Sequence, residues 1–171
     1  VEATLPNESR IIKAVKTVIF MESEQMYGDK GEVPEGEYII PLGVADIKRK
    51  GEDATVVTFG KIYHRVANAA EMLAKEGIDV EIVDLRTVRP IDYKTVIDSV
   101  RKTNRLVIVE EAWPLASIST EIAYKIQREA FDYLDAPIQR VTMRDVPMSY
   151  SANLVEATLP NESRIIKAVK T

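Results

Sequence analysis

The sequence predicts a three-layer α/β/α sandwich around a mainly parallel sheet of about five strands, with one antiparallel edge strand. Two observations carry this prediction. Short runs rich in Val, Ile and Leu recur along the chain, as in strands that are covered on both faces. These runs alternate with segments of helical periodicity, and two parallel strands need such a crossover between them.

The clearest part of this pattern is a strand, a helix and a strand near the middle of the chain. Glu81–Leu85 and Arg105–Glu110 are the two expected strands. Pro90 and Asp92 lie where a helix should begin, and Lys102 lies in its last turn, where a positive charge favours the negative end of the helix. The segment therefore predicts a right-handed βαβ unit.

The antiparallel edge strand is expected just before this unit. Val44–Arg49 alternates loosely between apolar and charged residues, and Lys50–Asp53 reads as a turn into the apolar run Ala54–Phe59. This pattern favours a hairpin, with lysines protecting the edge strand from pairing with other chains.

The remaining elements follow the same alternation. Gly77 stops one helix, and Asn161 can cap the terminal one, whose apolar side carries Ile165, Ile166 and Val169. The expected helices are Lys61–Lys75, Ala116–Glu129 and the terminal helix after Asn161, and the last parallel strand is Ile138–Met143. We predict no regular element between Asp145 and that terminal helix.

Composition narrows the function classes. The 171 residues suit one domain, and a net charge of −4 with 29% charged residues provides no basic surface for nucleic acid. No run of eighteen apolar residues could span a membrane, and we expect no signal peptide. The chain has no cysteine, which excludes disulfides, thiolate metal sites and a cysteine nucleophile.

The two ends of the chain carry the same sequence. Val1–Thr17, VEATLPNESRIIKAVKT, recurs letter for letter at Val155–Thr171. A perfect pair around a non-repetitive middle is unlike a solenoid, and points to a duplication or an artefact of joining. We expect the second copy to fill a groove of the domain. The first copy is then loose, displaces the second, or docks on a neighbouring molecule.

These observations divide the chain into three parts. Residues 1–17 are the duplicate of the C-terminal helix segment, residues 18–38 form a short connecting part, and residues 39–171 form the α/β domain. Within the connecting part, Val18–Met21 reads as a strand without partners. Gly28–Glu37 combines glycine, proline and charge, which is typical of a loop or linker.

Chemistry is expected beyond the carboxyl ends of the strands. No glycine-rich phosphate loop follows any strand, which argues against a nucleotide site. Glu110 and Glu111 could form a paired-carboxylate site, but neighbouring strand residues point to opposite faces, so one solvated carboxylate and one capping or interface carboxylate is the favoured reading. Trp113, which precedes a proline, is expected to anchor an interface or a core.

Other polar residues have ordinary structural readings. His64 is the only histidine, so a histidine-rich metal site is excluded and a surface or packing role is expected. Ser117 and Ser119 lie at a helix start, where they can cap it. Asp132 and Asp135 form an exposed acidic corner that is either turn chemistry or a docking point for a basic partner.

Four stretches carry a family resemblance. They read MESEQMYGDKGEVPEGEYIIPLGVADIKRKGEDATVVTFG, VEIVDLRTVRPID, KTNRLVIVEEAWP and EIAYKIQREAFDYLDAPIQRVTMRDVPMSYSANL. From about Val18 to Lys170 the chain resembles the C-terminal part of pyruvate dehydrogenase E1 β subunits, in the transketolase-like superfamily. Two of these motifs resemble the pyruvate-type subunits more than the branched-chain or acetoin relatives, namely EEAWP and MYGDKGEVPEGEY.

The resemblance implies a parent enzyme of E1 α and β subunits, an α2β2 heterotetramer. Such an enzyme decarboxylates pyruvate on thiamine diphosphate and Mg²⁺ and passes the acetyl group to the lipoyl groups of E2, between glycolysis and acetyl-CoA. The implied location is the bacterial cytoplasm or the mitochondrial matrix. The family's catalytic glutamate belongs to an N-terminal domain that this chain lacks. We therefore expect no catalytic, cofactor-binding or metal-binding residue here, and an inactive isolated chain.

The resemblance also implies roles for the residues singled out above. In the family this domain builds subunit interfaces and the surface that docks E2. Asp135, the acidic residue of the LDAP motif, is then expected to dock the basic peripheral subunit-binding domain of E2. Glu110, Glu111 and Trp113 are interface candidates, with the E1 α subunit and a second β subunit as partners. Val18–Met21 would be the last strand of the missing domain.

Other functions remain open at this point. Within the family, the alternatives are an E1 β subunit of a branched-chain 2-oxo acid or acetoin dehydrogenase complex. Outside it, they are a free-standing enzyme with a site at Glu110 or His64, and a small nucleotide-binding α/β domain.

Overall fold

The computed structural model describes residues 18–32 and 34–171, and the chain separates into two compact units between Ile40 and Pro41. That division lies two residues after the boundary expected from sequence. The second unit, Pro41–Thr171, carries a five-stranded sheet in the order β1-β3-β2-β4-β5. Its strands are β1 Asp46–Arg49, β2 Ala54–Thr58, β3 Val80–Asp84, β4 Leu106–Val109 and β5 Gln139–Val141.

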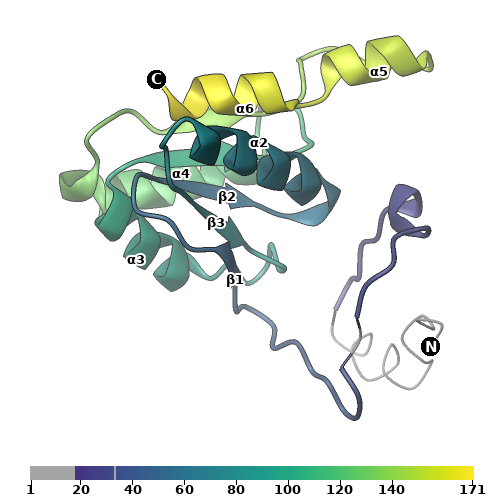
Figure 1. Cartoon of the computed structure of the whole chain (residues 1–171), viewed down its shortest axis with the longest axis horizontal. Helices are drawn as coiled ribbons and strands as arrows, with labels where there is room; N and C mark the ends of the chain where they lie inside the picture. The colour runs from purple at the N-terminus through teal and green to yellow at the C-terminus, as the bar shows by residue number, and fades with distance from the viewer. Residues whose placement is uncertain (1–17, 33) are drawn as a thin grey trace. The chain divides into compact units, whose positions relative to one another are not determined.

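Helices cover both faces of this sheet, which confirms the predicted three-layer sandwich. Figure 1 shows α2 and α6 on one side of the strands and α3 and α4 on the other. The α-helices are α2 Tyr63–Lys75, α3 Tyr93–Thr103, α4 Ile118–Glu129, α5 Ala152–Thr158 and α6 Glu162–Val169, and the short 3-10 helices are η1 Glu24–Met26, η2 Gly60–Ile62 and η3 Phe131–Tyr133.

The strand pairing confirms a mainly parallel sheet with one antiparallel edge, but the predicted hairpin is wrong. β1 pairs antiparallel with β3, and β2 lies between β3 and β4, parallel to both. The turn after β1 crosses the start of β3, where a Cβ on Gly51 would lie 2.3 Å from the carbonyl carbon of Val80. Glycine therefore permits a close crossing that places β3 between the two strands of the expected hairpin.

Asp92 and Asn161 lie at the helix starts that the sequence predicted for them. The Asp92 side chain accepts a hydrogen bond from the Thr95 amide at 3.1 Å and caps α3. Asn104 ends that helix in the left-handed conformation, with φ of 58°. The Asn161 side chain caps α6 by accepting from the Arg164 amide at 3.0 Å.

Each face of the sheet has its own apolar core. The core under α2 and α6 includes Leu73, Ile165 and Val169, whereas the core under α3 and α4 includes Val100 and Ile122. Alternate residues of each central strand supply the two cores, and that is why the strands read as continuous apolar runs.

Two expectations about the rest of the chain differ from the structure. Val18–Met21 forms no strand, and Ile19 is 89% exposed, because a strand needs a partner to satisfy its backbone and none of the described residues pairs with it. The stretch expected to be irregular before the terminal helix contains α5. The expectations for Val1–Thr17 lie outside the described residues.

No helix among the residues that the structure describes is both long enough and apolar enough to cross a membrane.

Candidate functional site

The carboxyl ends of the parallel strands carry polar side chains that point to both faces of the sheet. Thr58 ends β2, Asp84 ends β3 and Glu110 follows β4. Thr58 and Glu110 are fully buried. This edge is where ligands bind in open α/β sheets, so each of its polar groups needs a structural or functional explanation.

Glu110 joins the end of β4 to the start of α4. Its Oε1 accepts a hydrogen bond from the Ser119 amide at 3.2 Å, so this carboxylate caps the helix. Among the described residues, Oε2 of Glu110 and Oγ1 of Thr58 are buried without a hydrogen-bond partner. Strand alternation turns these two atoms toward opposite faces, so they do not form one site.

Glu111 points away from Glu110, as the alternation of strand side chains predicts. Its Oε1 lies 3.5 Å from Nζ of Lys61, which belongs to η2 on the other side of the sheet. The two adjacent carboxylates therefore have separate partners on separate faces. This geometry agrees with the favoured reading, in which the two carboxylates have separate roles.

Arg140 on β5 organises the loop before α4. Its Nε donates to Ser119 Oγ at 2.7 Å, and its Nη2 donates to Ser117 Oγ at 2.9 Å and to the Pro114 carbonyl at 2.5 Å. Ser117 occupies the N-cap position of α4, but its side chain makes no capping hydrogen bond. Sequence reasoning missed this arginine, because its partners come from a loop more than twenty residues earlier in the chain.

Asp84 and its neighbours form a second polar group at the end of β3. Burial raises the pKa of the Asp84 carboxyl above its ordinary value, although the Arg86 amide donates to it at 3.1 Å. Asp46 on β1 instead pairs with Lys48 and Arg86, and hydrogen bonding from Lys48 lowers the pKa of Asp46. Only one of these two carboxyls is thus stabilised in its charged form.

Trp113 lies on an exposed apolar surface near the same edge. The indole is 53% exposed, and its Nε1 donates to the Val146 carbonyl at 3.0 Å. This bond ties the loop after β4 to the chain after β5, where Val146 and Met148 are also exposed. An interface role for Trp113, Glu110 and Glu111 stays a prediction.

The acidic corner lies at the opposite, amino edge of the sheet. Asp135 follows η3, and its amide donates to the carbonyl of Asn104, just before β4, at 2.9 Å. The Asn104 side chain in turn donates to the Tyr133 carbonyl at 2.7 Å. Asp132 and Asp135 are exposed, and the Asp135 carboxylate makes no ion pair with another residue in the part of the chain that is described. The sheet therefore separates Asp135 from Glu110 and Trp113.

His64 lies exposed on α2, with its ring 5.7 Å from that of Tyr63 in an edge-on arrangement. Within residues 18–32 and 34–171, no group of three or more His, Asp or Glu side chains could hold a metal ion.

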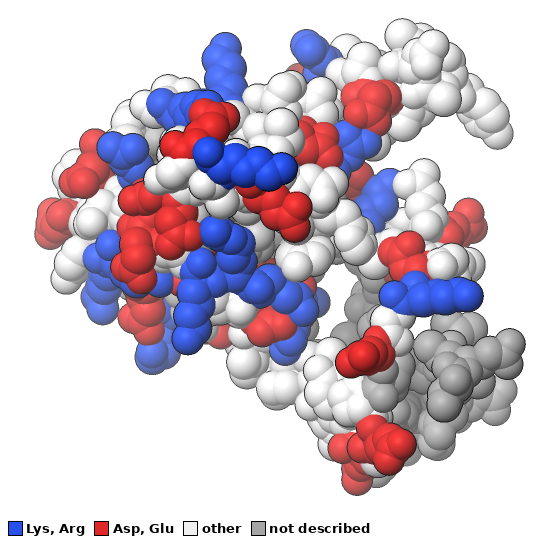
Figure 2. All heavy atoms as spheres, in the orientation of Figure 1, with Lys and Arg blue, Asp and Glu red and all other residues white. Residues whose placement is uncertain are grey.

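Charge is mixed over the surface. On the face shown in Figure 2, acidic and basic side chains are interspersed over the domain, without a basic stripe.

An open groove of about 810 Å³ runs beside α6, lined by residues such as Met72, Ile166 and Lys167. Glu156, which pairs with Arg65, also lines this groove.

The chain matches the family model described as transketolase, C-terminal domain, over residues 43–165. A pyruvate dehydrogenase E1 component subunit beta from Rhizobium meliloti is 51% identical over 93% of this chain and 35% of its own length. Its mitochondrial counterpart from Dictyostelium discoideum is 45% identical over 90% of this chain and 44% of its own length.

Two further similarities widen the comparison. The β subunit of an acetoin:2,6-dichlorophenolindophenol oxidoreductase from Cupriavidus necator is 44% identical over 94% of this chain and 48% of its own length. A solved split-gene transketolase, described as an inactive β4 tetramer, superposes with a TM-score of 0.69 at 26% identity, over 82% of this chain and 44% of that one. The chain thus spans less than half the length of the relatives that it matches.

Proposed function

Because the chain belongs to the transketolase C-terminal domain family, we propose that it is the assembly and partner-docking domain of a pyruvate dehydrogenase E1 β subunit. The observation that carries this proposal is the 51% identity to such a subunit over 93% of the chain. The relatives have homologous bacterial and mitochondrial forms, which supports a bacterial cytoplasm or a mitochondrial matrix as the location.

The proposed parent enzyme decarboxylates pyruvate on thiamine diphosphate and Mg²⁺ and transfers the acetyl group to lipoyl-E2. In the part of the chain that the structure describes, no three His, Asp or Glu side chains come together as a metal-ligand group. The reaction is therefore proposed for the parent enzyme, and no catalytic step is assigned to residues of this domain. Its proposed work is to hold an E1 α subunit, a second β subunit and E2.

The proposed E2-docking surface is the acidic corner with Asp135. Its backbone is held by the Asn104 carbonyl, so the exposed carboxylate projects from a fixed position. The Arg101 guanidinium lies over the Tyr133 ring, with 5.0 Å between its central carbon and the ring centroid, and this contact stabilises the same turn. A carboxylate that is positioned in this way suits a charge-assisted bond to an Arg or Lys of a basic partner.

Calorimetry with an isolated peripheral subunit-binding domain of E2 tests this docking. Asp135→Ala should weaken association by about 2–5 kcal/mol, because it leaves a basic group of the partner unpaired in the interface. The weakened complex should also depend less on salt. Glu71→Ala is the matched control, since Glu71 is an exposed acidic residue of α2 on the other face of the sheet. An Asp135→Ala chain that binds like the Glu71→Ala chain would remove Asp135 from the interface.

The acetoin relative supports a second candidate, a β subunit of an acetoin-type enzyme. Complementation separates the two: a full-length subunit that carries this domain should restore pyruvate oxidation, and restoration of acetoin oxidation alone would favour the alternative. Micromolar binding of thiamine diphosphate or a nucleotide to this chain by itself would contradict a purely assembling role.

A further inference from the structure

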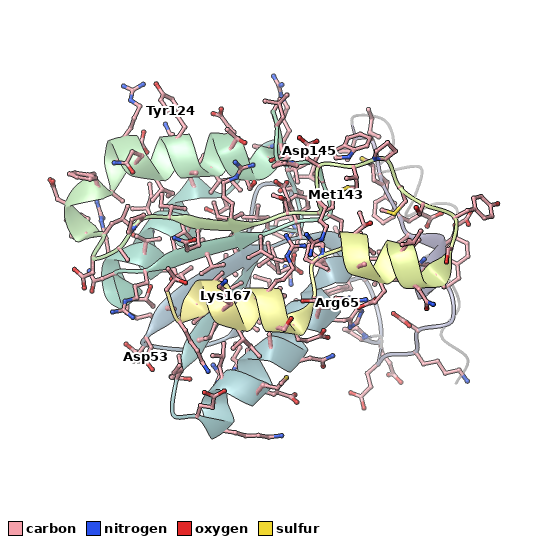
Figure 3. All side chains as sticks on the ribbon, turned by 90° about the horizontal axis from the view of Figure 1, so that it is seen from above. Asp53, Arg65, Tyr124, Met143, Asp145 and Lys167 are labelled. Atoms are coloured by element: carbon pink, nitrogen blue, oxygen red, sulfur yellow. The ribbon has the colours of Figure 1, made fainter. Side chains whose placement is uncertain are left out.

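The C-terminal segment Val155–Thr171 binds to a surface formed by other parts of the chain. We call this surface the α6-binding surface, and its polar residues are Arg65, Glu76, Thr142 and Arg144. Its apolar part is the core under α2, into which α6 inserts Ile165, 1% exposed, and Val169, 5% exposed. Figures 1 and 3 show α6 lying along α2.

Polar contacts fix the position of the segment on this surface. The Arg65 guanidinium binds both carboxylate oxygens of Glu156, at 2.5 and 2.6 Å, and Figure 3 shows Arg65 beside the junction of α5 and α6. Nη2 of Arg164 donates to the Thr142 carbonyl at 2.7 Å. At the other end of α6, Lys170 pairs with Glu76. Each contact joins one residue inside the segment to one outside it.

The first copy of the repeat carries the same set of contacting side chains. Because Val1–Thr17 is identical to Val155–Thr171, Ile11 and Val15 correspond to Ile165 and Val169, and Glu2 corresponds to Glu156. The named polar residues of the α6-binding surface all lie outside both copies. That surface therefore has no contact by which it could reject the first copy.

We propose that Val1–Thr17 is an alternative occupant of the α6-binding surface within the same molecule, and that it replaces Val155–Thr171 when the second copy is weakened. The 28 residues between Thr17 and β1 can span roughly 90 Å when extended. This exceeds the ~30 Å diameter of a small domain. An attached segment also acts at an effective concentration near millimolar, far above that of a neighbouring molecule in dilute solution.

Exchange of the segment between two molecules would not fill more of these surfaces, because every chain has one α6-binding surface and two copies of the segment.

Within one molecule the second copy is favoured by its connection to the rest of α5. Oγ1 of Thr158 donates to the Leu154 carbonyl at 2.7 Å, and Leu154 lies before the repeat. The first copy is joined to the domain only through the longer connection described above, so it takes over only when the second copy is impaired.

Matched substitutions in the two copies test the proposal by thermal unfolding of the full chain. Ile11→Ala alone should leave Tm unchanged, and Ile165→Ala alone should lower Tm by less than half of the loss in the double variant. The double variant should lose on the order of 10 °C, because either occupant then leaves a cavity in the core. Equal losses in Ile165→Ala and the double variant would overturn the proposal.

Two further measurements keep the outcome decisive. Deletion of residues 1–17 from the Ile165→Ala chain should lower Tm as far as the double substitution does. The Tm of the Ile165→Ala chain should also stay constant over a hundredfold range of protein concentration. A Tm that rises with concentration would show replacement between molecules and would overturn replacement within one.

Discussion

Both faces of the sheet have an apolar core, but they differ in the polar contacts that accompany it. Under α3, a buried polar network links the helix to two strands: the Thr55 and Ser99 hydroxyls lie 2.6 Å apart, and Ser99 donates to Glu81 at 2.5 Å. Glu81 is 2% exposed and pairs with Lys102. Under α2 and α6, by contrast, apolar side chains form the contact, and charged pairs such as Arg65–Glu156 lie at its rim.

The difference shows what each kind of contact can specify. A buried hydrogen bond requires one donor and one acceptor at a fixed separation, so the network determines which turn of α3 faces which strand residue. An apolar contact requires matched volume and area, so it tolerates substitutions that keep both. A segment that replaces α6 must therefore supply the same apolar stripe and the same polar groups at its rim, as Val1–Thr17 does by sequence identity.

The largest expected effect is on the apolar face. Leu73→Ala should reduce the free energy of unfolding by about 2–5 kcal/mol, because Leu73 is fully buried under α6 and its truncation leaves a cavity. Leu73→Met should cost less than about 1.5 kcal/mol, since volume is conserved. Urea denaturation measures both values. If the methionine variant is as unstable as the alanine variant, shape rather than volume controls this face.

A smaller effect is expected in the polar network. Glu81→Ala should cost about 1–3 kcal/mol, because it leaves the Ser99 hydroxyl without its acceptor. Lys102 stays 35% exposed at its side chain and can be solvated, which limits the loss. Glu81→Gln should cost less, because an amide oxygen can still accept from Ser99. Equal losses for Gln and Ala would show that the charge, and not the hydrogen bond, stabilises this face.

The smallest expected effect concerns Asp84, and it should appear as a change in the pH dependence of folding stability. Burial raises the pKa of Asp84 in the folded protein, so the folded protein holds this proton more tightly than the unfolded chain does. Ionised Asp84 therefore lowers stability above the folded pKa, and this penalty is absent below the unfolded pKa of about 4.

Asp84→Asn should accordingly raise Tm at pH 7, and the gain should disappear as the pH falls to about 4. The asparagine oxygen can still accept from the Arg86 amide, so the turn is preserved. Thermal unfolding of both chains across this pH range provides the measurement. Two curves that stay parallel at all pH values would contradict a raised pKa.

Much of the fold was predictable because its signals are local. Asp92 and Asn161 are N-caps that act on amides three residues away, and apolar periodicity marked α2, α3 and α4 to within a few residues. The opposite orientations of Glu110 and Glu111 followed from strand alternation alone.

The candidate site was less predictable because its contacts are long-range. Arg140 reaches Ser117 and Ser119 only after β5 has paired with β4, and no spacing in the sequence indicates this contact. The separation of Asp135 from Trp113 also depends on the direction of α4 across the sheet.

The amino-acid sequence by itself determined the alternation of strands and helices, their capped ends and the family, because these depend on residues within a few positions of each other and on motifs read directly from the chain. Only the tertiary structure decided that β1 pairs with β3 and not with β2. Strand pairing is a competition among distant segments for the same backbone groups. Its outcome here depends on a close crossing at Gly51 that local patterns do not reveal.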